Sequence, residues 1–271
     1  MRRREFVMSS VGLLGGWALA ANGQPVKKAS ATSSKISLGA AINKGGRQRM
    51  LSQRMVKAYS QLGLGVLPAR SMKILESSRA LFESQLTELL EFAPSPEIKA
   101  LYQEMKAAWP GMRENLITAP TAETGSLLYK SSEDILKIAH RATVELEKQS
   151  GRPAGKLVNI AGRQRMLSQR AAKLYMMREW RIPQATGQEL KLVRDEFKQA
   201  LAMLKSAPES VPEIKVHLDM AETQWLFFDR ALESQEIITQ DEGISRRNVA
   251  TTSEHLLEIF EIVTGLYERA V

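Results

Sequence analysis

Apolar residues recur with the period of an α-helix along most of this chain. Phe82, Leu86 and Leu89 are three or four residues apart, a spacing that gathers side chains on one face of a helix. No sustained alternation of apolar and polar residues, as expected for a strand, occurs. Proline and glycine divide the pattern into eight segments. The predicted helices are residues 37–63, 69–92, 97–118, 122–149, 155–180, 186–206, 213–238 and 243–270.

The chain contains a tandem repeat. Residues 43–54 return as residues 159–170, at an offset of 116, and the block GRQRMLSQR is identical in both copies. Further matches up to the third helix of each copy have an offset of 116 or, in the second helix, 115, and near the end the offset becomes 121, as for Glu133 and Glu254. We call residues 43–54 and 159–170 the two arginine motifs. The repeat indicates a duplication with small changes in loop length.

Each copy provides four helices of similar length with short connections, which is typical of antiparallel bundles. The sequence therefore predicts an all-α protein built as two tandem four-helix bundles. The first copy covers residues 37–150 and the second copy residues 151–271. A linker at residues 21–36 precedes them.

The first twenty residues have the pattern of a signal peptide. Arg2, Arg3 and Arg4 precede an apolar stretch of about 15 residues, which is shorter than the roughly 20 needed to span a bilayer, and Ala-Leu-Ala at 18–20 fits a cleavage site. The Arg3-Arg4 pair fits the twin-arginine pattern, and the general secretory route is the alternative. We expect removal of residues 1–20, export to the periplasm and no transmembrane segment afterwards, with an uncleaved anchor as the other possibility.

Charge is concentrated in two windows. The formal net charge is +8 from 38 basic and 30 acidic residues. Residues 6–75 hold ten basic and no acidic residues, and residues 148–178 hold eight and none, so the remainder carries 20 − 30 = −10. The excess of basic over acidic residues is thus located around the two arginine motifs. Together with the expected export, this argues against a nucleic-acid partner.

A helical wheel separates two sides of each motif helix. Leucine, methionine and alanine within residues 51–62 form a stripe that we expect to face the core of its own bundle. The opposite side includes a glycine, which destabilises a helix interior by up to about 1 kcal/mol relative to alanine and suits a close approach of another helix. We predict that the two motif helices pack against each other through this side. Its residues are Ile42, Gly46, Arg49 and Gln53 in the first copy and Val158, Gly162, Arg165 and Gln169 in the second.

Arg49 and Arg165 would be placed in this predicted helix–helix contact. A buried charge needs a partner, and neither window contains a carboxylate. We therefore expect a bound oxyanion between them, because the guanidinium group offers several fixed donors and keeps its proton. The alternative is a solvated basic face. The candidate anion-binding residues are Arg49, Arg165, Gly46, Gly162, Gln53, Gln169, Asn43, Asn159, Met50 and Met166. The flanking basic residues are Arg47, Arg54, Arg163 and Arg170, which would raise the local potential or lie in solvent.

The arginine motif resembles two related sensor families. Ile42-Asn43-x-x-Gly46-x-x-Arg49-Met50 is similar to the P-box of NarX-type nitrate/nitrite sensor kinases. The longer block resembles the N-terminal domain of PilJ-type type IV pilus methyl-accepting chemotaxis transducers, over residues 42–59 and 158–175. In the nitrate sensors, two P-box helices of four-helix bundles meet at a dimer interface and an arginine from each binds one nitrate. The resemblance implies nitrate or nitrite as the ligand, with Arg49 and Arg165 in that role.

The chain departs from those families in two ways. It has neither a second membrane span nor a kinase or methyl-accepting segment, and it carries both copies together. We therefore expect an exported sensory or ligand-binding protein that signals to a membrane sensor, transporter or chemoreceptor. The alternative is a non-catalytic structural or interaction module associated with a chemoreceptor, a transporter or a type IV pilus system.

Other chemistry is weakly indicated. Cysteine is absent, the histidines at 140, 217 and 255 are far apart, and no Glu-x-x-His, H-E-x-x-H, G-x-S-x-G or phosphate-loop pattern occurs. We expect no enzyme activity, no metal and no cofactor. Trp109 and Trp225 are expected in the core. Glu254, Glu258 and Glu261 share one side of the last helix and are expected to be solvated.

Overall fold

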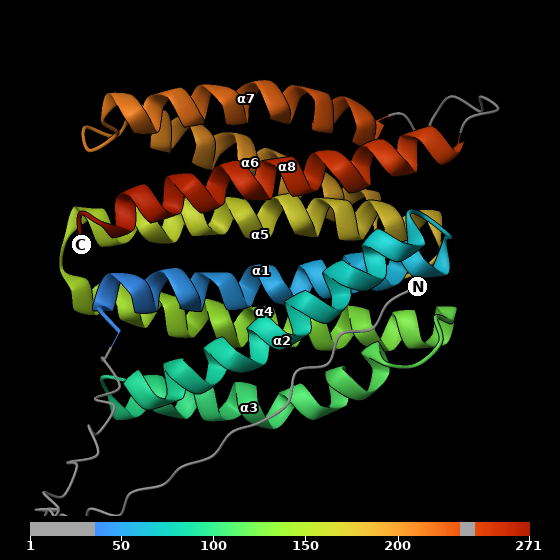
Figure 1. Ribbon diagram of the computed structural model, residues 1–271, viewed down its shortest axis with the longest axis horizontal. Coiled ribbons are helices and arrows are strands. Elements are labelled where there is room, and N and C mark those ends of the chain that lie inside the picture. Colours follow the sequence, from blue (N-terminus) through green and yellow to red (C-terminus); the bar gives the residue numbers. More distant parts are fainter. Residues whose placement is uncertain (1–35, 234–241) are drawn as a thin grey trace, which may run out of the picture. The chain divides into compact units, whose positions relative to one another are not determined.

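The computed structural model describes residues 36–233 and 242–271, and these residues form eight α-helices without a strand (Figure 1). The all-α prediction is confirmed. The predicted signal peptide and all but the last residue of the linker lie outside the described residues. The helices are α1 (Leu38–Gly63), α2 (Pro68–Phe92), α3 (Pro96–Leu116), α4 (Ala122–Ser150), α5 (Pro153–Glu179), α6 (Gly187–Ser206), α7 (Pro212–Glu233) and α8 (Glu242–Glu268).

Local capping residues account for the helix boundaries. The side chains of Ser37, Ser95 and Thr121 accept hydrogen bonds from backbone amides in the first turns of α1, α3 and α4. Proline occupies the first position of α2, α3, α5 and α7, where its missing N–H is not needed. The predicted bounds agree within about two residues, except that the predicted end of the seventh helix, 234–238, lies outside the described residues.

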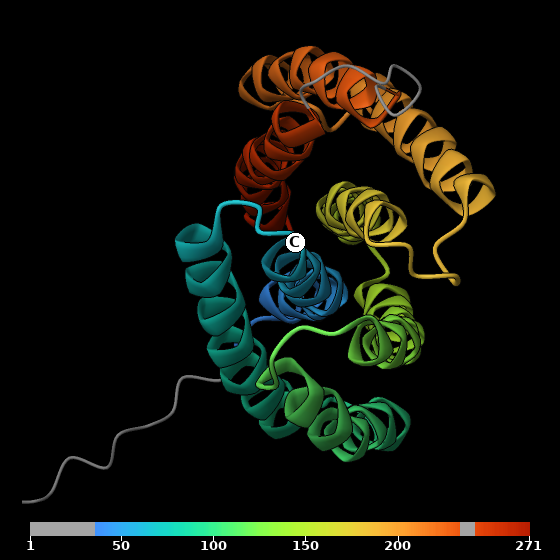
Figure 2. The ribbon, with the colours of Figure 1, turned by 90° about the vertical axis from the view of Figure 1, so that its right-hand side faces the viewer.

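The two motif helices form the most extensive helix–helix contact of the structure. In the first copy α1 also packs against α2 and α4, and α3 packs against α4; in the second, α5 packs against α6 and α8, and α7 against α8 (Figures 1 and 2). The predicted pairing of the motif helices is confirmed. The described residues form one compact unit, and its division into two bundles at residue 150 remains a prediction from the repeat.

The aromatic core repeats with the sequence. Trp109 packs on Phe82 with 4.4 Å between ring centroids, and Trp225 stacks on Phe197 at 3.8 Å. All four side chains are buried, so the two tryptophans belong to the core, as expected. Such aromatic pairs anchor each copy separately around its own motif helix.

A very short link joins the two copies. Only Gly151 and Arg152 separate α4 from α5. Gly151 has a φ of 59°, in the left-handed region that residues with a β-carbon avoid, and this conformation ends α4. The reversal of the chain at this point lets α5 return alongside α4 and α1.

Candidate functional site

Helices α1 and α5 lie close together at the glycines of the two arginine motifs. A β-carbon added at Gly46 would lie 3.8 Å from the Cα of Gly162, and one at Gly162 would lie 3.9 Å from the Cα of Gly46. The added β-carbon at Gly46 would be 3.1 Å from Nη2 of Arg49 and 3.6 Å from Nη2 of Arg165. The one at Gly162 would be 3.1 Å from Nη2 of Arg165 and 3.6 Å from Nη2 of Arg49. The glycines therefore make room for two guanidinium groups, and both arginines are fully buried.

Arg165 is neutralised by a carboxylate from α8. Its Nη1 atom donates to Oε2 of Glu261 at 2.6 Å, and Arg47 donates to both oxygens of the same carboxylate. Nη2 of Arg165 donates to Oδ1 of Asn43 at 2.7 Å. The expectation that Arg165 lacks a carboxylate is thus wrong. The reason is that the matching acid comes from a helix 96 residues further along the chain. Glu261, which was expected to be solvated, is partly buried and ion-paired, with 31% of its side chain exposed.

Arg49 has a different environment. Its Nη1 atom lies 3.4 Å from Nδ1 of His140, and its Nη2 atom donates to the backbone oxygen of Asn159 at 3.3 Å. Within residues 36–233 and 242–271, no carboxylate forms an ion pair with Arg49. Burial, followed by the fields of Arg163 and Arg165, lowers the pKa of Arg49 to about 9. Arg49 therefore carries a poorly compensated charge.

His140 takes the place of Glu261 in the repeat. The two residues are related by the offset of 121, which also relates Glu133 to Glu254. Burial, followed by the charges of Arg49 and Arg163, lowers the pKa of His140 to about 4. The imidazole is consequently neutral at pH 7. In the duplicated site, the second copy therefore has the carboxylate of Glu261 and the first copy has the neutral side chain of His140 at the equivalent position.

The remaining candidate residues surround this crossing in a repeated pattern. Asn43 donates to Glu268 of the second copy at 2.5 Å, and Asn159 donates to Glu147 of the first copy. Gln53 and Gln169 lie one turn beyond the arginines and donate to the backbone oxygens of Ser132 and Ser253. Met50 and Met166 are buried in the apolar core. The structure thus brings both asparagines to the crossing and places the glutamines against α4 and α8.

The flanking arginines are partly buried and ion-paired. Arg54 binds Glu254, Arg163 binds Glu196, and Arg170 binds both Glu133 and Glu189. Arg47 shares Glu261 with Arg165. These arginines raise the positive potential around the crossing, but each has an acidic partner from another helix.

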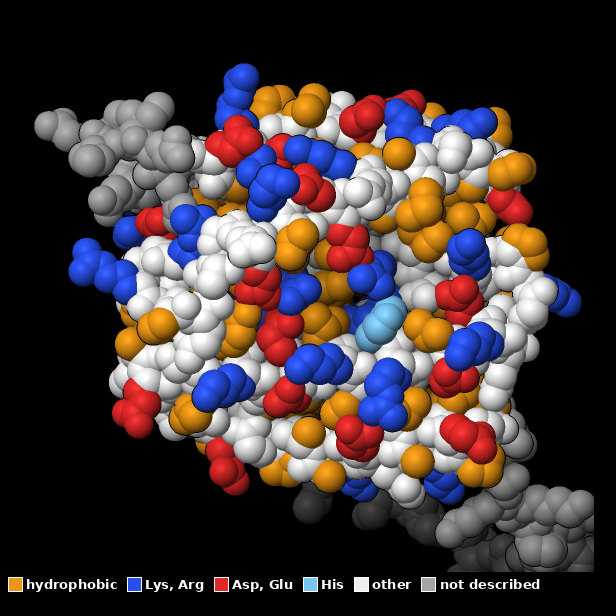
Figure 3. Space-filling model, turned by 180° about the vertical axis from the view of Figure 1, so that it is seen from behind, with side chains coloured by type: hydrophobic (Ala, Val, Ile, Leu, Met, Phe, Trp, Pro, Cys, Tyr) orange, Lys and Arg blue, Asp and Glu red, His pale blue; other side chains and the backbone are white. Residues whose placement is uncertain are grey.

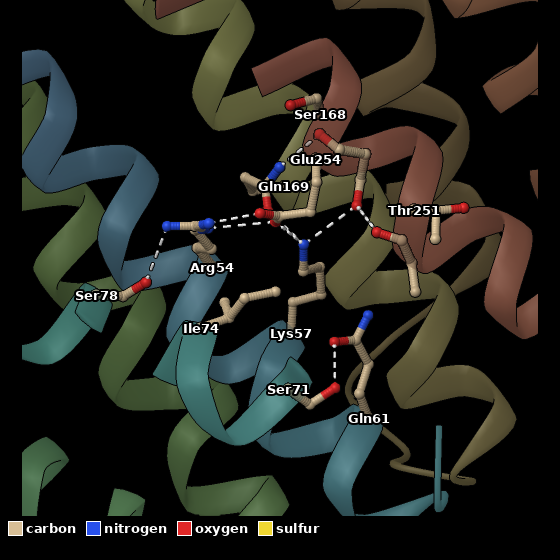
Figure 4. Close-up of polar contacts among 12 residues, drawn as sticks. Arg54, Lys57, Gln61, Ser71, Ile74, Ser78, Ser168, Gln169, Thr251 and Glu254 are labelled. Carbon is tan, nitrogen blue, oxygen red and sulfur yellow. Dashed lines mark hydrogen bonds and ion pairs between the residues drawn. The ribbon is translucent and has the colours of Figure 1, made fainter. Parts of the chain in front are cut away.

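Two buried lysines complete the site, and the sequence interpretation missed their role. Lys57 of α1 is fully buried, and its Nζ atom donates to Glu254 at 2.5 Å, to Gln169 at 2.7 Å and to Ser253 at 3.1 Å (Figure 4). Lys173 of α5 donates to Glu133 at 2.7 Å in the corresponding place. Each lysine therefore ties the motif helix of one copy to the last helix of the other.

These ion pairs cross from one copy to the other, and the sequence contained a signal for them. Lys57 and Lys173 match at the offset of 116, and Glu133 and Glu254 match at 121. The expectation that Glu254 is solvated is wrong, since the residue is only 4% exposed. In a pseudo-symmetric pair of copies, the base of each copy can pair with the acid of the other copy. Such reciprocal contacts require both the base and the acid to be repeated.

Acid is expected to destabilise the protein in two stages. Burial lowers the pKa of His140 from 6.5 to about 4, so the unfolded chain binds the extra proton and stability falls as the pH decreases through this interval. Burial alone would raise the pKa of Glu254 and of Glu261, but their cationic partners outweigh it and hold both near 2, so a second loss occurs between about 4.5 and 2. Urea unfolding measured from pH 8 to 2 shows both stages. His140→Gln should remove the first stage alone, and an unchanged first stage in that variant would contradict the assignment.

The fold and the site define a duplicated helical bundle in which side chains from facing helices build a polar site in the interior, a common arrangement for ligand-binding bundles. A family model described as type IV pili methyl-accepting chemotaxis transducer N-term, PilJ, matches residues 31–134 and 149–251. The chain therefore belongs to the PilJ family, and its two matched regions are sensory domains of the chemotaxis-transducer type. Searches of curated proteins and of solved structures returned no match. Of the helices described, none has the length and apolar character needed to cross a membrane.

Proposed function

We propose that the protein is an exported, non-catalytic sensory protein that binds a small oxyanion, nitrate or nitrite first, at the crossing of α1 and α5. The observation that carries this proposal is the meeting of two fully buried arginines, Arg49 and Arg165, at the paired glycines. Two like charges in a buried contact repel each other, and an anion close to them relieves that repulsion. The family adds support, since its members are sensory domains of chemotaxis transducers.

Signal transfer follows from the same contact. An anion that binds near both arginines favours the arrangement of α1 and α5 in which the two arginines are closest. A ligand shifts a conformational equilibrium only when its affinity differs between the two conformations. Through the buried lysines, each motif helix is tied to the last helix of the other copy. We propose that a membrane chemoreceptor, sensor or transporter reads the change in the periplasm.

The test is calorimetry on the protein with sodium nitrate and sodium nitrite. Four heavy atoms at about −1.5 kcal/mol each limit nitrate to about −6 kcal/mol, or tens of micromolar, so the titration extends to millimolar concentrations. Arg49→Met combined with Arg165→Met should weaken binding about tenfold or more. Arg113→Met, an exposed arginine of α3, is the control and should leave binding unchanged. Failure of the unaltered protein to bind either anion would contradict the proposal.

One observation favours the alternative of a structural or interaction module. Arg165 and all the flanking arginines have carboxylate partners within the chain, so most of the basic residues hold the helices together without a ligand. In that case neither anion binds, and the double arginine variant loses stability only.

A further inference from the structure

The two halves of the site differ at equivalent positions, and the first difference indicates which ligand the site of the first copy accepts. In the second copy, the carboxylate of Glu261 receives hydrogen bonds from Arg165 of α5 and from Arg47 of α1. In the first copy the equivalent residue is His140, next to Arg49 of α1 and close enough to Arg163 of α5 for both charges to lower its pKa. The second copy therefore shows which group this arrangement of arginines binds, a planar, singly charged carboxylate.

A second difference makes the first copy more polar. Tyr102 of α3 corresponds, at the offset of 116, to Leu218 of α7. The Tyr102 side chain is fully buried, and its hydroxyl group has no hydrogen-bond partner among the described residues. A β-carbon at Gly45 would lie 3.2 Å from this hydroxyl and 3.0 Å from Oγ1 of Thr143. Gly45 and Thr143 are one helical turn from Arg49 and His140, respectively, so a spare buried donor lies close to the poorly compensated arginine.

The first copy also has an opening to solvent at this place. A groove of about 510 Å³ lies between α3 and α4, with Ala100, Leu101, His140 and Val144 in its lining. Figure 3 shows the side of the molecule opposite to the view of Figure 1, where basic and acidic side chains are mixed over a hollowed surface. His140 is half-buried and touches both the groove and Arg49. It therefore separates the arginine from the solvent-filled groove.

We propose that the first copy contains a binding site for a singly charged carboxylate or other planar oxyanion, which enters by the α3–α4 groove, displaces His140 and binds Arg49 where Glu261 binds Arg165. This inference rests on the proposed function and narrows it to one anion per chain. The Tyr102 hydroxyl is placed to donate a further hydrogen bond. Three acids at the groove, Glu97, Glu104 and Glu145, outnumber Arg141, and this net negative lining disfavours multiply charged anions such as sulfate more than singly charged ones. A carboxylate can extend its alkyl chain into the groove, whereas the contact between the two glycines leaves no space for one.

The experiment uses sodium nitrate, acetate and butyrate as calorimetric probes of the whole chain. The unaltered protein should bind nitrate, acetate and butyrate with one site per chain. His140→Glu supplies the carboxylate that the second copy already has, and should weaken binding of all three probes about tenfold or more while raising the melting temperature. Ala100→Trp fills the groove without a change of charge and should weaken butyrate binding about tenfold.

Two control variants match these changes elsewhere. His255→Glu introduces the same charge on the exposed side of α8, and Ala107→Trp introduces the same bulk at an exposed position of α3; both should bind like the unaltered protein. Nitrate binding that persists in His140→Glu and in Ala100→Trp, without any binding of acetate or butyrate, would overturn this inference and leave the proposed function intact. Absence of binding by all probes to the unaltered protein would overturn both.

Discussion

Glu254→Gln is expected to lower the free energy of unfolding by about 3–5 kcal/mol. The carboxylate of Glu254 is the acidic partner of both Lys57 and Arg54, and Lys57 is fully buried. Its loss leaves the ammonium group with neutral acceptors only, on Gln169 and Ser253. An unpaired charge in the interior is among the largest single destabilisations known. Equilibrium unfolding in urea at pH 7 measures the effect.

The pH dependence and a second substitution identify the cause. Burial lowers the pKa of Lys57 to about 8 even with Glu254 present, so without the carboxylate the lysine loses its proton more easily and the penalty should shrink as the pH rises from 7 to 9. Lys57→Met in the Glu254→Gln background should recover part of the loss. Glu258→Gln, at an exposed position one turn further along α8, is the control and should change stability little. Equal effects of the two glutamate substitutions would contradict the buried ion pair.

Gly46→Leu is expected to destabilise the protein by about 3 kcal/mol or more. Its β-carbon would already be 3.1 Å from Nη2 of Arg49, and the rest of the side chain would extend towards the backbone of α5 at Gly162. Either the two motif helices separate or both guanidinium groups move. Anion binding should be lost together with stability, because the same contact serves both. Urea unfolding and nitrate calorimetry on the variant give the two measurements.

A glycine in an open position provides the matched control. Gly111 is also inside a helix, α3, and a β-carbon there would meet no atom within 4 Å. Gly111→Leu should therefore leave stability unchanged or raise it by up to about 1 kcal/mol through helix propensity. If Gly46→Leu behaved like Gly111→Leu, the close contact of α1 and α5 would be wrong.

Periodicity and breaking residues were sufficient to predict the helices. Proline at 68, 96, 153 and 212 begins a helix in each case, because its fixed φ and missing N–H suit the first turn. The side of α1 that faces α5 was also predictable, since Gly46 and Arg49 lie on the face opposite to the apolar stripe. A helix with an apolar stripe on one face and a contact surface for another helix on the opposite face has to be covered by protein on both faces, as α1 is.

The partners of the buried charges were not predictable by the same reasoning. A search for acids close in sequence to Arg165 could not find Glu261, because helices of a folded chain meet irrespective of their separation in sequence. Glu254 and Glu261 have the spacing of an ordinary solvated helix face, and only the location of α8 beside the motif helices buries Glu254 and pairs Glu261 with Arg165. The repeat held the missing information, since a residue of one copy that contacts the other copy predicts a second contact of the same kind. His140 is informative because it departs from that rule.

The two-residue link between α4 and α5 has a consequence for how the paired helices respond to dilution. A contact between separate subunits weakens as protein concentration falls, because its stability depends on the concentration of protomers. Here Gly151 and Arg152 join the two halves covalently, so each motif helix meets its counterpart at a fixed, high effective concentration. The linked copies are also encoded separately, so one half can change independently of the other. A symmetric dimer would have to exchange both glutamates for histidines at once, whereas this chain keeps one of each.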